Sequence, residues 1–190
     1  QRESKELLAA GKEPHPCVLD DILPADKIES VVDMGLIEIP AHLIVGTKIA
    51  GRKTAFTANF RPLLGVDTEF AHKWVNLCAA HLEEGIRDPV LCFEYLGKFY
   101  VQEGNKRVSV LRHFDAPRIT GNVRRVLPAR SEEPRTKAYY EFLDFYKVSR
   151  LYTVQFRRPG DYARLLSYMG KNSDEIWTED ERRNFGAYFH

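Results

Sequence analysis

Residues 103–107, Glu-Gly-Asn-Lys-Arg, form a short segment whose residue types could bind a phosphate group. An alternating apolar run precedes the segment, and a helix-like pattern follows it. Where a strand leads into a helix, unpaired backbone N–H groups and the helix dipole both favour an anion. Lys106 adds a point charge, and Arg107 adds a planar fork that matches phosphate oxygens. We call residues 103–107 the box, and we expect an anion site there, with Arg107 as its principal ligand.

The other residues of this region have less specific chemistry. Gly104 permits a positive φ and a close approach of the backbone to a phosphate. Asn105 either caps the helix or contacts a ligand, and capping is the more common role. Ser109, one turn into the helix, either donates to a phosphate or faces solvent. Glu103 is the candidate for holding Mg²⁺ or for acting as a general base.

The elements that must position the box can be read from periodicity and from turn residues. A tight turn at Leu96-Gly97 joins the two strands that precede the box. Residues 178–181 read as a capping box that opens a final helix. The sequence predicts strands over residues 35–45, 90–95, 98–102, 118–127 and 151–157, and helices over 4–10, 25–32, 68–84, 105–114, 136–148 and 160–169.

Residues 46–54 contain the glycines and the Lys-Thr pair of a phosphate-binding P-loop. The spacing is one residue too long, and no helix is expected to follow, whereas a P-loop requires strand, loop and helix in succession. We therefore expect a mobile basic loop near the ligand here and no P-loop.

Charge is distributed unevenly along the 190 residues, although the net charge is only +1. Residues 1–105 carry 11 Lys and Arg against 16 Asp and Glu, and residues 106–190 carry 17 against 11. A basic half favours an anionic partner such as a nucleotide or nucleic acid, and an ordinary solvated surface is the alternative.

The rest of the composition limits the class of protein. Hydrophobic residues make up 44% of the chain, which is enough for a packed core. No apolar run approaches the roughly 18 residues that span a bilayer, so no membrane segment is expected. The three cysteines, Cys17, Cys78 and Cys92, have no zinc-ligand spacing and are expected to be reduced thiols of a cytoplasmic protein. The sequence gives no oligomeric state.

The box, together with the order of the strands and helices predicted around it, resembles the ParB/sulfiredoxin superfamily over about residues 35–127. Glu-Gly-Asn-Lys-Arg is similar to the Asp-Gly-x-His/Lys-Arg box of the ParB-like nuclease and kinase branches. Residues 59–62, Asn-Phe-Arg-Pro, resemble the Gln-Pro-Arg element that lines the family's nucleotide pocket, which adds Arg61 to the candidate ligands. Residues 84–89 resemble the family's Glu-x-Gly-x-x-x-Pro segment.

The resemblance implies an α+β fold, a ParB/sulfiredoxin-like small mixed sheet with helices, followed by a C-terminal helical extension. The expected boundaries are a helical lead-in over 1–34, a nucleotide- or phosphate-binding domain over 35–128, and the extension over 129–190. The resemblance also implies that a nucleotide such as CTP or ATP binds to Gly104, Asn105, Lys106, Arg107, Ser109 and Arg61. It implies further that Glu103 binds Mg²⁺.

The function that follows is that of a bacterial, cytoplasmic, ParB-like nuclease-class domain. Its chemistry would be Mg²⁺-dependent phosphoryl transfer or phosphodiester hydrolysis, with nucleic acid as a further candidate partner. The alternative is a non-enzymatic, DNA-associated or regulatory module that senses nucleotide. Asn105 stands where sulfiredoxins carry their catalytic cysteine, so sulfinic acid reduction is not expected. No helix-turn-helix follows the domain, so binding to a partition site is not expected either.

Overall fold

The computed structural model describes residues 2–11, 13–23, 25–63, 65–187 of the chain. These residues divide into two compact units, unit 1 over Gln1–Leu127 and unit 2 over Pro128–His190. Each unit is described by itself below. Within the described residues, no helix combines the length and the apolar character needed to cross a membrane.

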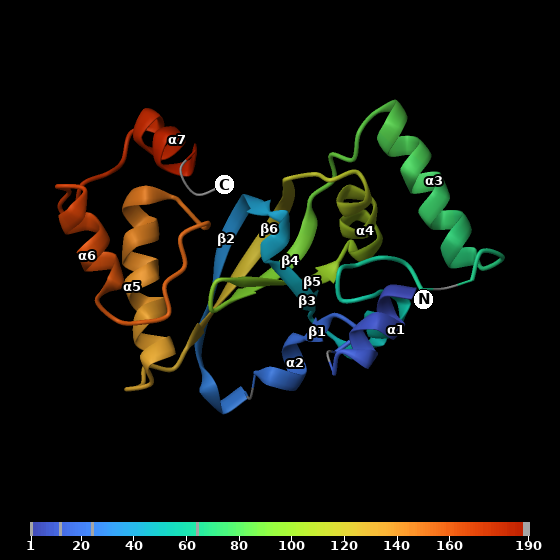
Figure 1. Cartoon of the computed structure of the whole chain (residues 1–190), viewed down its shortest axis with the longest axis horizontal. Coiled ribbons are helices and arrows are strands. Elements are labelled where there is room, and N and C mark those ends of the chain that lie inside the picture. Colours follow the sequence, from blue (N-terminus) through green and yellow to red (C-terminus); the bar gives the residue numbers. More distant parts are fainter. Residues whose placement is uncertain (1, 12, 24, 64, 188–190) are drawn as a thin grey trace. The chain divides into compact units, whose positions relative to one another are not determined.

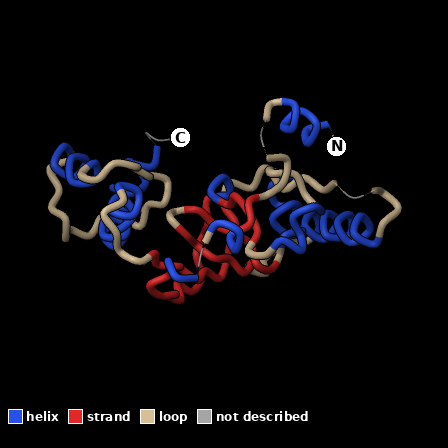
Figure 2. The backbone as a smooth tube through the Cα atoms, turned by 90° about the horizontal axis from the view of Figure 1, so that it is seen from below, coloured by secondary structure: helices blue, strands red, loops and turns tan. Residues whose placement is uncertain are grey.

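Unit 1 is built on one six-stranded mixed sheet, which is the red block of Figure 2. β4 and β5 pair antiparallel, while β1 with β3, β3 with β5, and β4 with β6 pair parallel. The α+β class and the mixed sheet predicted from the sequence are therefore confirmed. Across the sheet the order is β1 (Cys17–Val18), β3 (Ile44–Thr47), β5 (Lys98–Glu103), β4 (Val90–Tyr95), β6 (Arg118–Pro128) and β2 (Ile28–Pro40).

The hairpin that leads into the box forms as predicted. Leu96 has φ 49° and Gly97 has φ 77°, so both turn residues have the positive φ that two-residue hairpins favour. Glu94 is fully buried beside this turn, and its Oε1 accepts the Gly97 N–H at 2.7 Å. The other carboxylate oxygen accepts from Arg125 Nε at 2.5 Å, on the neighbouring strand.

Two main helices accompany the sheet in unit 1, α3 (Glu69–Glu83) and α4 (Asn105–His113), and α3 lies outward of α4 (Figure 1). α4 buries Val108, Val110 and Leu111, whereas no residue of α3 is fully buried. Thr68 caps α3 by accepting the Ala71 N–H at 3.2 Å. The short helical elements of unit 1 are α1 (Arg2–Ala9), α2 (Leu19–Ile22), η1 (Ala25–Lys27), η2 (Ala41–Leu43) and η3 (Ala50–Ala55).

Two predictions about the first half of unit 1 are wrong. The helix expected over residues 25–32 is absent, because the 3₁₀ turn η1 ends at Lys27 and β2 begins at Ile28. The β-branched residues Val31 and Val32 fit a strand better than a helix. The single strand expected over 35–45 is divided by η2 between β2 and β3. After β3, where a P-loop would lead into an α-helix, the chain forms the 3₁₀ helix η3. The sequence likewise predicted no P-loop here.

Unit 2 packs three helices, α5 (Pro134–Ser149), α6 (Asp161–Tyr168) and α7 (Glu179–Ala187), around an aromatic core. Trp177 is buried, and its ring meets Phe145 at 5.6 Å between centroids. The predicted capping box is confirmed, because the Thr178 N–H donates to Glu181 Oε2 at 2.8 Å and the Glu181 N–H donates to Thr178 Oγ1 at 3.3 Å. The strand expected over 151–157 is wrong, since this segment is an irregular loop.

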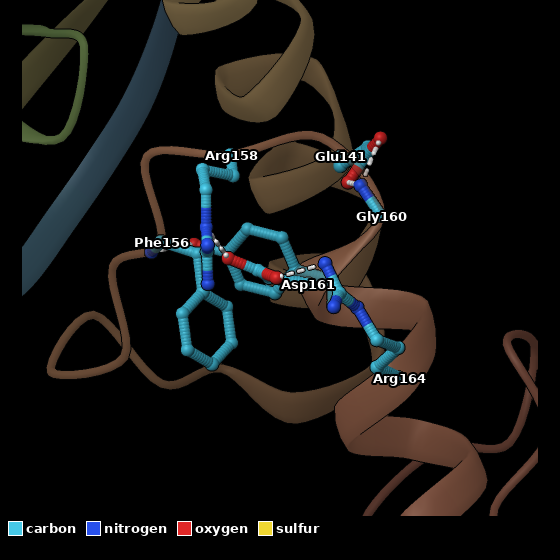
Figure 3. A network of polar contacts seen from close by, with 7 residues as sticks. Glu141, Phe156, Arg158, Gly160, Asp161 and Arg164 are labelled. Carbon is cyan, nitrogen blue, oxygen red and sulfur yellow. Dashed lines mark hydrogen bonds and ion pairs between the residues drawn. The ribbon is translucent and has the colours of Figure 1, made fainter.

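A polar network fixes the start of α6 within unit 2 (Figure 3). Gly160 is the N-cap of α6 with φ 84°, and its N–H donates to both carboxylate oxygens of Glu141, at 2.7 and 3.0 Å. Asp161 pairs with Arg164 at 2.6 Å and with Arg158 at 3.4 Å. In this network a positive-φ glycine begins a helix with its N–H bonded to a carboxylate of the same unit.

Candidate functional site

The box adopts the strand-to-helix geometry predicted for it. β5 ends at Glu103, Gly104 has φ 96° and is the N-cap, and α4 begins at Asn105. The Val108 N–H donates to Gly104 O at 3.0 Å, which is the first bond of the helix. A Cβ added at Gly104 would lie 2.7 Å from Val90 Cγ1, so both the backbone conformation and the packing require glycine here.

Asn105 does not cap the helix, so the more common of its two expected roles is wrong. The cap position is Gly104, one residue earlier, and it provides no side chain. Asn105 is 9% exposed, and its Oδ1 is a buried acceptor without a hydrogen-bond partner among the described residues. Buried polar atoms are almost always paired, so this one requires an explanation.

Lys106 lies over an aromatic ring at the start of α3. Its Nζ is 4.9 Å from the centroid of Phe70, and the Phe70 ring meets Phe56 edge-on at 5.4 Å. A cation–π contact of this kind stabilises by about 0.5–1 kcal/mol at an exposed site, so a stronger anionic partner can displace it. The contact links the box to α3 and to the segment after η3.

We expected Arg107 to be the principal phosphate ligand. In the structure its guanidinium forms hydrogen bonds with backbone carbonyls. One terminal nitrogen, Nη1, donates to the carbonyls of Asp88 at 2.9 Å and Pro89 at 2.7 Å. These contacts hold the segment before β4 against the first turn of α4. Its planar fork therefore has a structural role, whatever it contributes to a ligand.

We expect Arg107→Ala to destabilise the chain by about 1.5–3 kcal/mol, which is typical for hydrogen bonds donated by a charged group. The free energy of unfolding from urea denaturation measures this loss. Lys73→Ala, which removes an exposed cation paired with Glu69 on α3, is the matched control and should cost under about 0.5 kcal/mol. Equal costs for the two variants would show that the Arg107 contacts do not stabilise the fold.

Ser109 is buried, so the expectation that it might face solvent is wrong. It is 2% exposed, and its Oγ accepts from Trp74 Nε1 at 2.9 Å. The Trp74 ring also meets His113 edge-on at 5.3 Å. Ser109 therefore joins α4 to α3, and its position supports a structural role. The sequence did not reveal this contact, because its periodicity identified Trp74 only as one apolar residue of a predicted helix.

Arg61 lies in the loop between η3 and α3, and its side chain is exposed. Its backbone N–H donates to Thr57 Oγ1 at 3.2 Å, and its carbonyl accepts the Thr57 N–H at 2.8 Å. The preceding residue, Phe60, is buried with φ 61°. Phe60 meets the Phe56 ring at 5.9 Å, so aromatic packing through Phe56 and Phe70 connects this loop to the box.

Arg112 is an important residue that the sequence reasoning missed. Its Nη2 donates to the carbonyls of Ile44, at 2.7 Å, and of Ala41, and its guanidinium lies 5.2 Å from the Phe60 ring centroid. Burial lowers the pKa of Arg112 below its ordinary value. The contacts tie the far end of α4 to the turn between β2 and β3, which fixes the direction of the helix whose N-terminus carries the box.

Glu103 is exposed at the end of β5, directly before the box glycine. Over the described ranges, no cluster of three or more His, Cys, Asp or Glu side chains could hold a metal ion. Mg²⁺ commonly takes one or two carboxylates from the protein and completes its shell with water and substrate phosphates. A single carboxylate such as Glu103 would be enough only for a Mg²⁺ ion that arrives with a phosphate.

The three thiols are poorly suited to act as nucleophiles. Cys92 is fully buried, and burial raises its pKa to about 12. Burial also raises the pKa of Cys17 and of Cys78. A thiol is a poor nucleophile, and the reactive thiolate is disfavoured at all three positions.

Comparisons with known proteins give only distant likeness. No protein-family model matches the chain, and no curated protein matches it. Among solved structures, the chain is similar to sulfiredoxin from Arabidopsis thaliana, with 19% sequence identity and a TM-score of 0.34. The match covers 47% of this chain and 84% of the sulfiredoxin chain, and at this identity it concerns the fold alone.

Proposed function

We propose that unit 1 is a nucleotide- or phosphate-binding domain of the ParB-like nuclease class, with its ligand at the N-terminus of α4. The observation that carries the proposal is the box itself, in which a positive-φ glycine cap begins α4 so that its first backbone N–H groups, Asn105 and Lys106 lie at one helix end. A helix N-terminus with glycine and adjacent cations is a common arrangement for phosphate.

The proposed chemistry is Mg²⁺-dependent phosphoryl transfer or phosphodiester hydrolysis. Glu103 would hold Mg²⁺, which, when bound, supplies charge neutralisation for the phosphate oxygens. The protein's part is to position the phosphate on the first turn of α4, where fixed dipoles and Lys106 favour negative charge. In phosphoryl transfer, such positioning and electrostatic stabilisation supply most of the catalysis.

A non-enzymatic module that senses nucleotide is the second candidate. The observation that favours it is that Lys106, Arg107 and Ser109 also contact other elements of unit 1. A ligand that draws Lys106 away from Phe70 would loosen the N-terminal end of α3, a helix without a fully buried residue. Binding would then be coupled to the position of α3. Turnover that is lost in Glu103→Ala separates the enzyme from the sensor, which binds without turnover.

Calorimetric titration with CTP, ATP and GTP, each with and without Mg²⁺, tests the proposal. We expect one nucleotide to bind, and Lys106→Ala to weaken it about ten-fold or more, because a charged contact to phosphate is lost. Lys106→Ala is a better probe than Arg107→Ala, since Arg107 also holds the fold.

The matched control is Lys147→Ala, which removes an exposed lysine of α5 that pairs with Asp144. This variant keeps the same net charge as Lys106→Ala and should bind like the wild type. If none of the three nucleotides binds, or if the two lysine variants bind equally, the ligand is not at the box.

A further inference from the structure

An open hollow of about 600 Å³ lies on the surface of unit 2, between the segment that precedes α5 and one side of that helix. Sites for small ligands commonly have volumes of about 300–1,000 Å³, so this hollow is large enough for one. Its charged and aromatic lining consists of Arg130 and Glu132 from the segment, and of Lys137, Tyr140, Glu141 and Asp144 from α5. Spacings of three and four residues place the α5 members on one side of the helix. The hollow therefore combines both signs of charge with an aromatic ring.

Arg130 is held in position in the hollow, but its charge is not paired. Its guanidinium lies 4.0 Å from the centroid of the Tyr140 ring, and the Tyr140 hydroxyl donates to the Pro128 carbonyl at 2.7 Å. Within the part of unit 2 that the structure describes, the guanidinium forms no hydrogen bond or ion pair. The other cation of the lining, Lys137, pairs with Glu132. The planar fork of Arg130 is thus available for a carboxylate, which it fits through two parallel N–H bonds.

Negative charge lies further along the same side of α5. Glu141 accepts the Gly160 N–H at the start of α6 and keeps its charge (Figure 3). Asp144 pairs with Lys147 at 2.8 Å, but the two side chains are 75% and 74% exposed. Such an exposed pair contributes little, so Asp144 can exchange Lys147 for another cation. One end of the hollow is therefore positive, and the other is negative.

From this arrangement we propose that unit 2 binds a short peptide with free termini, about the size of a dipeptide. Its carboxylate contacts Arg130, and its ammonium group lies at Glu141 and Asp144. Residues four apart on a helix, such as Tyr140 and Asp144, are about 5–6 Å apart, which sets the distance between the two ends. An extended dipeptide spans about 7 Å, whereas a single amino acid spans about 3.5 Å. The proposal concerns unit 2 alone and does not depend on the nucleotide site of unit 1.

The hollow favours a ligand with both charges, because each end disfavours the wrong one. A ligand with two carboxylates would place one of them beside Glu141 and Asp144, and a ligand with two ammonium groups would place one beside Arg130. Like charges in contact reduce affinity for the wrong ligand. Because the Tyr140 ring already restricts Arg130, binding a carboxylate there costs less side-chain entropy than it would at an unrestricted arginine.

Three ligands that differ in their end groups test the proposal. They are diglycine, N-acetyl-diglycine, which has no ammonium group, and diglycine amide, which has no carboxylate. Each is titrated at low salt into the ¹⁵N-labelled chain, and the affinity is measured from the amide shifts of residues 130–144. Diglycine should bind about ten-fold or more tightly than either derivative, because each derivative lacks one charged contact. Added salt should reduce this difference, because it screens exposed charges.

Two variants assign each end of the ligand to its side chain. Arg130→Gln should weaken diglycine about ten-fold or more and leave diglycine amide unchanged, because the amide has no carboxylate for the arginine to bind. Asp144→Asn should weaken diglycine about three-fold or more and leave N-acetyl-diglycine unchanged, with Glu141 as the remaining carboxylate. The matched controls Arg135→Gln and Asp174→Asn change exposed residues outside the hollow, and both should bind all three ligands like the wild type.

The possible results separate a peptide site from an unused surface. A preference for diglycine that each variant removes only at its own end supports the proposal. The proposal is overturned by equal affinities for the three ligands, by the absence of shifts in residues 130–144 at millimolar diglycine, or by control variants that weaken binding as much as Arg130→Gln. None of these results bears on nucleotide binding at the box, so the two proposals can fail separately.

Discussion

Replacing Arg125 by methionine should cost about 3–5 kcal/mol of the free energy of unfolding, which is typical when one partner of a buried ion pair is removed. Arg125 Nε donates to Glu94 Oε2 at 2.5 Å, and the two side chains are 8% and 0% exposed. Without Arg125, the Glu94 carboxylate stays buried without this cation, and its Oε1 still accepts the Gly97 N–H. Urea denaturation of the variant and the wild type measures the loss.

A second substitution shows whether the loss comes from the unpaired charge. Glu94→Gln in the Arg125→Met background removes that charge and keeps an oxygen for the Gly97 N–H. We expect the double variant to recover stability to within about 1–2 kcal/mol of the wild type, because replacing a buried ion pair by uncharged groups is often near neutral. Lys147→Met, which breaks an exposed pair, should cost under about 0.5 kcal/mol. A loss below about 1 kcal/mol in Arg125→Met would contradict the buried pair.

Gly104→Ala should have the second large effect, on both stability and binding. The substitution places an L side chain at φ 96° and brings its Cβ to 2.7 Å from Val90 Cγ1. Positive φ costs about 1–2 kcal/mol for an ordinary residue. Crowding in a packed core costs about 1–3 kcal/mol more. We therefore expect a total loss of about 2–5 kcal/mol, together with loss of nucleotide binding as the start of α4 shifts.

The chain contains a close control for this substitution. Gly160, labelled in Figure 3, is also a helix N-cap with φ 84°. Apart from its own chain neighbours and helix backbone, nothing lies within 4 Å of an added Cβ there. Gly160→Ala should lose only the cost of a positive φ, about 1–2 kcal/mol of the free energy of unfolding. It should bind nucleotide like the wild type. Val90→Ala combined with Gly104→Ala should recover part of the loss by making space. Equal losses in Gly104→Ala and Gly160→Ala would show that Val90 does not restrict the box.

The features that the sequence predicted correctly depend on neighbouring residues. Gly104 stands where the alternating pattern changes to a helical one, so the turn could be expected from a few residues alone. The same holds for the positive-φ turn at Leu96-Gly97 and for the capping box that Thr178 begins. Periodicity and turn chemistry both act over this short range.

The features that the sequence did not reveal depend on residues far apart in the chain. Arg107 bonds carbonyls 18 and 19 positions away, Trp74 bonds Ser109 across 35 positions, and Arg112 bonds the carbonyl of Ile44 across 68. No local pattern encodes such partners. For this reason, cations that read as phosphate ligands turned out to contact carbonyl groups and rings as well.

The expected strand over residues 151–157 failed for a related reason. Its β-prone residues Tyr152 and Val154 are buried in the aromatic core of unit 2, so side-chain packing uses them without strand pairing. The Tyr162 hydroxyl accepts the Phe156 N–H at 3.1 Å and donates to the Val154 carbonyl at 3.1 Å. These bonds satisfy backbone groups that a strand would have paired. Burial of β-prone residues alone therefore does not distinguish a strand from a packed loop.

The central claim is that the N-terminus of α4 binds the phosphate of a nucleotide, and amide chemical shifts test it most directly. The measurement is a two-dimensional ¹H–¹⁵N correlation spectrum of the labelled chain during titration with Mg²⁺ and the nucleotide that binds. We predict that the largest shifts belong to the backbone N–H groups of residues 104–107 and to the side-chain NH₂ of Asn105. Large shifts confined to other elements, with residues 104–107 unchanged, would contradict the claim.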